Sequence, residues 1–515
     1  FAAVSETAYG IVARNRGLAS AVTGMLWGDE VRKPHYFAAR RWFLRALGAI
    51  YLIAFISLWV QVDGLIGTGG ILPIAEYLSA ARAQIGANSV FQLPTLCWLN
   101  SSNTFLHFLC GSGAVISLLL IAEIAPLLCL AALFVLYLSL SVAGQTFLEF
   151  QWDILLLETG FLAIFFAPWQ WWPKAGRAPP CSRIGLFLLK LLLFKLMFLS
   201  GVVKLTSGDE SWWKLTALDY HYWTQPLPTV FAWYADQSPE WLKKITVAAA
   251  LFVELVVPFF IWAPRRPRLV AFALLVSFQL GIALTGNYAF FNLLTISLCL
   301  LLLDDAVIGR RKLAPAAPDR ARAFAGLLQS AAILGLLLTL PLNLMLFRQA
   351  FEPEAPWPHA LGRLYAFAQP FRIVNSYGLF RVMTKSRPEI TIEGSADGST
   401  WLRYEFKWKP GDLRVAPRWV APHQPRLDWQ MWFAALGTPR ENWWFLRLCQ
   451  RLLENNPEVT RLLRHNPFAQ APPRYLRATS YDYRFTSAAE RRVTGEWWKR
   501  QWHGEYLPTV SLGND

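Results

Sequence analysis

Apolar stretches of membrane-spanning length recur along the first two-thirds of the chain. A helix needs roughly 20 apolar residues to cross the hydrocarbon core of a bilayer. The pattern therefore predicts a polytopic α-helical membrane protein with about nine transmembrane helices, at residues 42–62, 104–122, 125–143, 150–168, 184–206, 244–264, 268–287, 289–303 and 324–347. The pair that meets at Gly286-Asn287 either crosses twice or forms a re-entrant pair.

Residues 348–515 have a different pattern, polar and aromatic with short alternating runs. The runs EITIEG and TWLRYEFKW alternate on both sides of a Gly-containing turn, which predicts a β-hairpin. A helical period indicates short amphipathic helices in NWWFLRLCQRLLEN and PEVTRLLRH. Strand-like composition returns in RYLRATSYDYRF and WWKRQWHGEYLPTV. We expect a C-terminal α+β domain with a small β-sheet.

Charge then orients the chain, which is 55% hydrophobic and 16% charged with a net charge of +15. Lys and Arg gather in the N-terminal tail and in the loops 169–183, 263–268 and 304–323. Nine spans place all of these on one side, which the positive-inside bias identifies as the cytoplasm. We expect a cytoplasmic tail (1–34), a membrane domain (35–347) and an extracytoplasmic domain (348–515), and no nucleic-acid partner. The host membrane would be a bacterial inner membrane, or the endoplasmic reticulum in a eukaryote.

Several ionisable residues lie inside the predicted spans, where charge is costly and indicates either helix pairing or a functional site. At ~1.5 Å rise per residue, Lys204 comes to the depth of Asp153, and Lys195 comes closer to that of Glu158. These depths predict the pairs Lys204–Asp153 and Lys195–Glu158, with Glu254 near the middle of the membrane. The alternative is a purely structural role, because such pairs can hold helices together without taking part in any reaction.

Lys204 stands out because the helix that carries it breaks at once into LTSGDESWWKLTALDYHYWTQPLP. In one interpretation Lys204 extends to the membrane surface and the aromatic residues form an interfacial belt. In the other, a desolvated Lys204 acts as a base. The residues expected around it are His107, Asp153 and His221 for proton relay, and Trp212, Trp213, Asp219, Tyr220 and Trp223 for binding. The six cysteines form no metal-binding pattern, so we expect no metal site.

Several blocks in order resemble the lipase maturation factor family: HYFAARRWFLRALGAIYLIAF, FLEFQWDILLLETGFLAIFFAP, NYAFFNLLTISLCLLLLDD, FRIVNSYGLFRVMTKSRPEITIEGS, YEFKWKPGD, RLDWQMWFAAL and HNPF. Members are polytopic membrane proteins, and those of vertebrates sit in the endoplasmic reticulum with a lumenal C-terminal part. There they are required for secreted lipases to reach an active, dimeric fold. The resemblance implies a membrane protein that assists maturation of secreted clients such as lipases. Its short loops look like those of a bacterial member.

Two weaker resemblances add an alternative. GVVKLTSGDESWW is similar to the lysine-containing segment of vitamin K-dependent γ-glutamyl carboxylase. It implies a membrane enzyme that uses Lys204 as a base on a quinone or a lipid-borne substrate, with a quinone as cofactor. AYGIVARNR, at residues 8–16, resembles the last helix of DCC-type domains and implies a thioredoxin-like redox domain as a partner before it.

Overall fold

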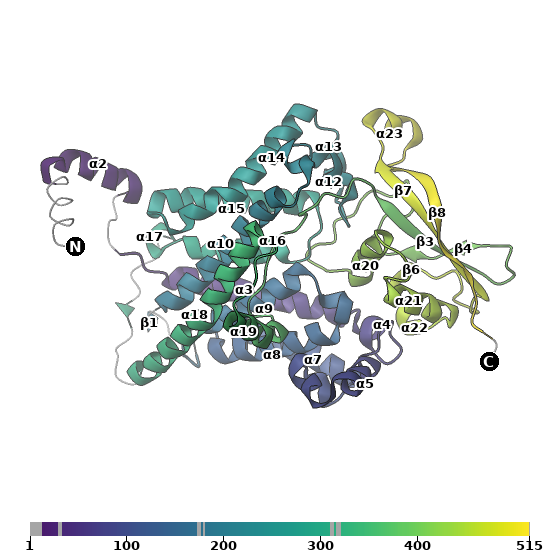
Figure 1. The fold of residues 1–515 in the computed structure, drawn as a ribbon, viewed down its shortest axis with the longest axis horizontal. Coiled ribbons are helices and arrows are strands. Elements are labelled where there is room, and N and C mark those ends of the chain that lie inside the picture. The colour runs from purple at the N-terminus through teal and green to yellow at the C-terminus, as the bar shows by residue number, and fades with distance from the viewer. Residues whose placement is uncertain are drawn as a thin grey trace.

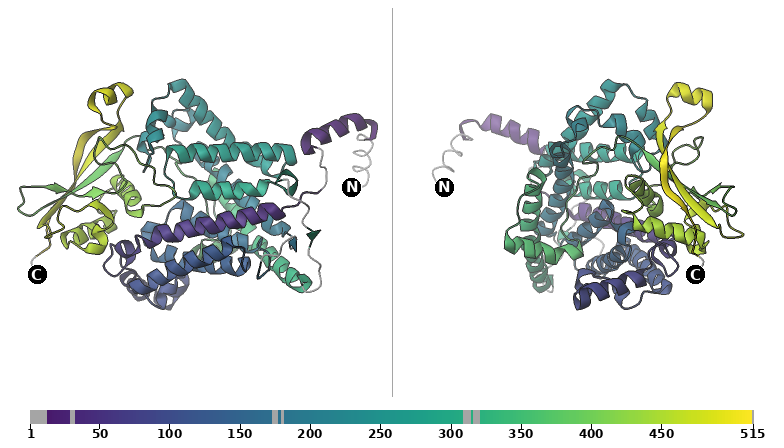
Figure 2. Two further views of the ribbon diagram at one scale, coloured as in Figure 1. Left: turned by 180° about the vertical axis from the view of Figure 1, so that it is seen from behind. Right: turned by 45° about the vertical axis from the view of Figure 1, so that its right-hand side comes forward.

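The computed structural model describes residues 13–28, 33–172, 177–178, 181–308, 314–315 and 321–513. Long helices form a bundle, and a smaller unit of strands and short helices sits at one end of it, here called the sheet end (Figure 1). The helix α2 (Arg16–Trp27) lies at the opposite end, as a view from behind also shows (Figure 2). Most of the AYGIVARNR segment lies outside the described residues, and the thioredoxin-like partner stays a prediction.

Seven helical segments in the described part of the chain are long and apolar enough to cross a membrane. They are α3 (Phe37–Trp59), α7 (Asn103–Ile121), α8 (Pro126–Ala143), α10 (Arg183–Thr206), α14 (Glu240–Leu255) with η4 (Val257–Trp262), α15 (Arg265–Thr285) and α18 (Ala321–Phe351). This confirms a polytopic helical membrane protein.

Two of the nine predicted spans are shorter than expected. The helix α9 (Gln151–Ile164) has 14 residues, and α16 (Phe291–Cys299) with η5 (Leu300–Leu302) is also short. At ~1.5 Å per residue, α9 rises only about 21 Å against a hydrocarbon core of about 30 Å. The count of nine transmembrane helices is therefore not confirmed.

Short helices fill the connections between the long ones. They are α4 (Val62–Ile66), α5 (Ile74–Ile85), η1 (Gly86–Asn88), α6 (Ser89–Gln92), η2 (Leu96–Trp98), η3 (Gln145–Leu148), α11 (Glu210–Trp213), α12 (Leu218–Thr224), α13 (Val230–Asp236) and α17 (Asp305–Ile308). The chain turns sharply after α10 at Gly208, whose φ of 79° is one that glycine adopts without strain. Asp209 then caps α11 by accepting from the backbone N–H of Ser211 at 2.9 Å.

The sheet unit contains a four-stranded antiparallel sheet in the order β4-β3-β7-β8. Its strands are β3 (Pro388–Ser395), β4 (Leu402–Arg403), β7 (Tyr475–Phe485) and β8 (Trp498–Val510). A second pair joins β5 (Glu405–Phe406) to β6 (Leu463–His465), and β1 (Arg177–Ala178) pairs with β2 (Ala314–Pro315) elsewhere. The helices around it are α19 (His359–Ala368), η6 (Gln369–Phe371), α20 (Arg426–Ala435), α21 (Trp443–Leu453), α22 (Pro457–Thr460) and α23 (Ala488–Thr494). The predicted small sheet is confirmed.

Two local predictions were only partly right. The hairpin forms, but β4 pairs with β3 at two positions only, Glu393↔Arg403 and Gly394↔Leu402. Beyond Tyr404, which is buried beside Phe468, the chain leaves β3 and β5 pairs with β6. PEVTRLLRH forms a single helical turn, α22, and then β6, because pairing with β5 replaces the helix that the period predicted.

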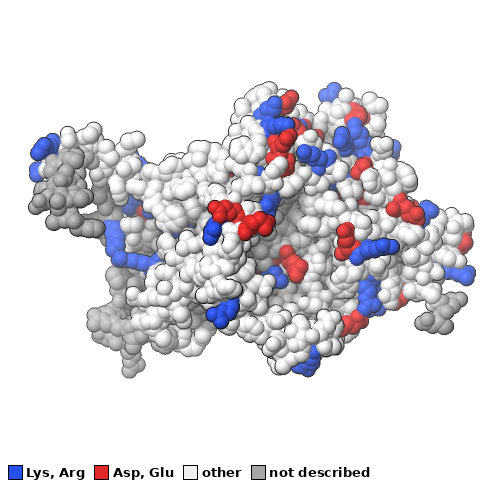
Figure 3. Space-filling view, viewed as in Figure 1, with Lys and Arg blue, Asp and Glu red and all other residues white. Residues whose placement is uncertain are grey.

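Aromatic side chains pack the sheet against the bundle. Tyr222 and Trp223 of α12 and Trp233 of α13 share one buried cluster with Tyr483, Phe485 and Trp498 of the sheet. Figure 3 shows that charged side chains on this face gather toward the sheet end, while much of the bundle surface between them is uncharged. This is the distribution expected of helices that face lipid beside a unit that faces water.

Candidate functional site

Lys204 lies in the last turn of α10 and is paired with Glu254 of α14. Its Nζ donates to Glu254 Oε1 at 2.6 Å and Oε2 at 2.8 Å, and to the carbonyl of Ser200 at 3.2 Å. The ring of Trp212 lies 5.2 Å from Nζ, and both charged side chains are buried. The predicted pair Lys204–Asp153 is wrong, because depth along a helix does not say which neighbour its side chain faces.

Asp153, at the start of α9, pairs instead with Arg426 of α20. The guanidinium donates to Asp153 Oδ1 at 2.8 Å and Oδ2 at 2.9 Å, and to the carbonyl of Phe147 at 2.7 Å. Tyr137 also donates to Asp153. Asp153 and Arg426 have no exposed surface, so this pair joins the bundle to the sheet unit rather than serving Lys204.

The structure brings Glu158 and Lys195 together within the bundle, as their depths suggested. Lys195 donates to Glu158 and, at 2.8 Å, to Asn343 of α18. The second oxygen of Glu158 accepts from Tyr377 at 2.7 Å and from the backbone and side chain of Asn375. Both oxygens of Glu158 and the Nζ of Lys195 therefore have partners, which is how such charges become tolerable in a membrane.

His221, on α12, is the predicted relay residue that lies closest to the Lys204 charge. Burial and, next, that charge lower the pKa of His221 to about 4, so the imidazole is neutral near pH 7. Its ring stacks edge-on against Phe380 at 4.5 Å, and Nε2 lies 3.4 Å from the hydroxyl of Tyr288. Among the described residues, no hydrogen bond joins it to Lys204.

His107 lies elsewhere at the sheet end, on α7. Trp59 Nε1 donates to its Nδ1 at 2.7 Å, and its Nε2 lies 3.0 Å from Asp63 Oδ2. Because Nδ1 accepts a hydrogen bond, the ring proton is on Nε2, which donates to Asp63. Both ring nitrogens are therefore engaged, neither of them with Lys204, and the relay role of His107 stays a prediction.

The predicted binding residues divide into packed and exposed ones. Trp212 and Trp223 are buried, and Trp223 belongs to the cluster under the sheet. Trp213 is 65% exposed, as an interfacial side chain would be. Asp219 lies 3.6 Å from Lys243, and Tyr220 faces the ammonium of Lys385 at 5.9 Å. These side chains therefore face different partners.

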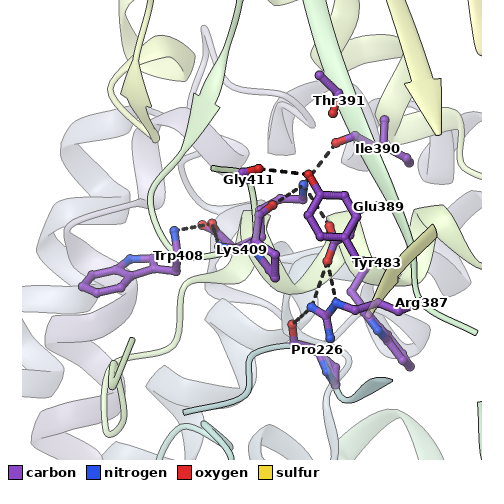
Figure 4. A network of polar contacts seen from close by, with 12 residues as sticks. Pro226, Arg387, Glu389, Ile390, Thr391, Trp408, Lys409, Gly411 and Tyr483 are labelled. Carbon is purple, nitrogen blue, oxygen red and sulfur yellow. Dashed lines mark hydrogen bonds and ion pairs between the residues drawn. The ribbon is translucent and has the colours of Figure 1, made fainter. Parts of the chain in front are cut away.

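Arg387 is a key residue that the sequence reasoning missed. It donates to the carbonyls of Trp223 at 2.8 Å and Pro226 at 2.7 Å, and also to that of Gln225. Figure 4 shows its guanidinium between Pro226 and Glu389, which accepts at 2.8 Å; Lys409 pairs with the other oxygen of Glu389 at 2.9 Å. The only signal in the sequence was a basic residue directly before a predicted strand.

Asn287, between α15 and α16, makes a second backbone clamp. Its side chain donates to the carbonyls of Leu227 at 3.0 Å and Arg418 at 2.8 Å. Its oxygen accepts from the backbone N–H groups of Val420 and Ala421. Together with Arg387, it holds the loop after α12 and the 418–421 segment in fixed positions.

The ion pairs and clamps described above hold helices and loops together. Both oxygens of Glu254 engage the Nζ of Lys204, and this contact joins α10 to α14. The geometry does not favour the alternative in which Lys204 is a base on a quinone. Within the described ranges, no group of three or more His, Cys, Asp or Glu side chains is placed to hold a metal ion.

Comparisons with known proteins agree with this architecture. The lipase maturation factor transmembrane domain matches residues 38–310, and the lipase maturation factor C-terminal domain matches residues 373–508. No solved structure matches the chain.

Named relatives cover nearly all of the chain. Lipase maturation factor 2 of Gallus gallus is 38% identical over 598 residues, which cover 95% of this chain and 82% of the relative. Lipase maturation factor 2 of Homo sapiens is 37% identical, with 92% and 83% covered. Lipase maturation factor 1 of Bos taurus is 35% identical, with 94% and 90% covered. The chain therefore belongs to the lipase maturation factor family.

Proposed function

We propose that this protein is a membrane-embedded maturation factor for secreted lipases. The observation that carries the proposal is the similarity to proteins named lipase maturation factors, which extends over 95% of the chain for one relative. Its clients would be lipases and other secreted proteins that need help to reach an active fold.

The contacts between bundle and sheet unit support a scaffold role. The Asp153–Arg426 pair, the Arg387 clamp and the Asn287 clamp all join residues more than 100 positions apart. Buried polar groups that pair across two parts hold them in one geometry, since other arrangements leave charges unpaired. A rigid unit at the membrane surface suits a protein that receives another chain.

The basic loops support an orientation with the sheet end outside the cytoplasm. In this proposal residues 1–34 form a cytoplasmic tail, 35–347 the membrane domain and 348–515 the extracytoplasmic domain. Secreted clients fold on that side, in the endoplasmic reticulum lumen of a eukaryote or beyond the inner membrane of a bacterium.

The test is a secreted lipase produced in cells that lack their own lipase maturation factor. Expression of this chain should raise the activity per amount of secreted lipase, and the control is a secreted protein that folds without help. Equal specific activity with and without the chain would contradict the proposal.

A further inference from the structure

A groove opens on the sheet unit beside β3, where β4 has ended. Its walls come from Ile390 and Thr391 of β3, from the segments 403–412 and 415–418, and from Arg464 of β6. Pro228, in the loop that the Arg387 clamp holds, also lines it. Figure 4 shows five of its lining residues, Ile390, Thr391, Trp408, Lys409 and Gly411, around the Arg387–Glu389 pair, with Trp408 off to the left.

The lining of the groove is strongly basic. It contains five basic side chains and two acidic ones, Glu405 and Asp412. Lys409 is neutralised by Glu389 at 2.9 Å, and Arg464 lies 3.9 Å from Glu405. In the described part of the chain, no ion pair joins an acidic side chain to the other three, which are Arg403, Lys407 and Arg418. The groove therefore presents positive charge without an internal partner.

The groove offers side chains rather than free backbone to a bound chain. Pairing between β3 and β4 stops at Glu393, but the carbonyl of Ile392 still accepts from the backbone N–H of Tyr404, and that of Ile390 accepts from Lys409 Nζ at 3.1 Å. Trp408, Pro410 and Pro417 add flat, rigid walls. Because β3 is buried here, a chain in the groove would be held by contacts with these walls and with the basic side chains rather than by strand pairing.

We propose that this groove binds an extended, acidic segment of a secreted protein that has not finished folding. This inference rests on the proposed function, because it names the part of the chain that meets the client. Acidic side chains of the segment would pair with Arg403 and Arg418, and the segment would lie between the walls that Trp408, Pro410 and Pro417 form. A lipid surface fits less well, because aromatic and proline walls confine the basic groups to a groove.

The test measures binding of fluorescently labelled short peptides to the full chain in a nonionic detergent. One peptide alternates Glu and Thr, and its matched partner alternates Gln and Thr. The variant Arg403→Gln/Arg418→Gln removes two cations without breaking an ion pair. The control variant Arg440→Gln/Arg492→Gln removes two exposed cations of the sheet unit that lie outside the groove. Thermal unfolding of each variant shows that the fold is kept.

We expect wild type and control to bind the acidic peptide equally, and the groove variant to bind it about tenfold more weakly, as the loss of two partly exposed ion pairs predicts. The neutral peptide should bind weakly to all three. Equal loss in both variants, equal binding of the neutral peptide, or no binding to wild type would overturn the proposal. So would displacement of the peptide by phosphatidylserine vesicles alone, which would assign the groove to a membrane.

The lipase assay separates this proposal from the one on which it rests. If wild type supports lipase maturation, the groove variant should lose most of that support and the control variant should keep it. A groove variant that loses peptide binding yet matures lipase fully overturns the groove as a client site, while the proposed function stands. If wild type gives no gain in lipase activity, the proposed function fails, and the peptide titration still decides whether the groove binds acidic chains.

Discussion

The Asp153–Arg426 pair offers the sharpest test of how the sheet unit is attached to the membrane helices. Arg426→Met removes the guanidinium and leaves Asp153, which has no exposed surface, with Tyr137 as its remaining side-chain partner. The variant should lose about 3–5 kcal/mol of unfolding free energy, the usual cost of breaking a buried pair from one side. The free energy of protonating an ordinary aspartic acid at pH 7 gives a similar figure, about 4 kcal/mol.

The matched variant Asp153→Leu/Arg426→Met removes both charges. Replacing a buried ion pair by apolar side chains is often neutral or stabilising, so most of the loss should be recovered. Denaturant unfolding in detergent would be measured for wild type, Arg426→Met, Asp153→Leu and the double variant. The coupling free energy between the two sites should be several kcal/mol. Limited proteolysis should cut the single variant faster in the sheet unit. A single variant within about 1 kcal/mol of wild type, or a double variant equal to the sum of the singles, would refute the reasoning.

Three further predictions follow from the structure. Lys204→Arg should keep lipase maturation because it preserves the pair with Glu254, whereas Lys204→Met should lose about 3–5 kcal/mol of stability; an inactive but stable Lys204→Arg protein would restore a chemical role for the lysine. The pKa of His221 is lowered to about 4 in the folded state, so its contribution to stability is present near pH 7 and is lost as pH falls from about 6.5 toward 4. His221→Gln should remove up to about 2 kcal/mol of the stability change between pH 7 and pH 5, and unchanged pH dependence in calorimetry would contradict this. In intact cells, an impermeant maleimide should label Arg492→Cys but not Arg266→Cys, two exposed positions at opposite ends of the molecule; labelling of the second alone would reverse the orientation.

The membrane character, the small sheet and the family could be predicted from the sequence. Hydropathy reports burial in lipid directly, and the blocks that resemble the lipase maturation factor family lie in order along the chain. The depth of each residue along its helix also predicted that Glu158 lies near Lys195, because the rise per residue is nearly constant. The same rule failed for Lys204. It put Asp153 at the depth of Lys204 and Glu254 near the middle of the membrane, whereas Lys204 pairs with Glu254 and Asp153 with Arg426.

The sequence analysis missed the contacts that the C-terminal residues make with the rest of the chain. Arg426 lies 273 positions from Asp153, and Arg387 lies more than 160 positions from the loop it clamps. Nothing local marks an arginine as buried, because its environment is built by distant segments. Short elements were also mispredicted where tertiary pairing decided, as in β6.

The strand β8 is a free edge of the sheet, and a protein that works among unfinished chains must keep such an edge from capturing them indiscriminately. Three register shifts interrupt its pairing with β7, and the longest regular run is the five pairs from Trp498 to Trp502. That run carries Lys499 and Arg500, and Pro508 removes a backbone donor farther along. An unfolded chain therefore finds little continuous backbone to pair with, so we expect β8 to resist edge-to-edge pairing with the clients of the proposed function.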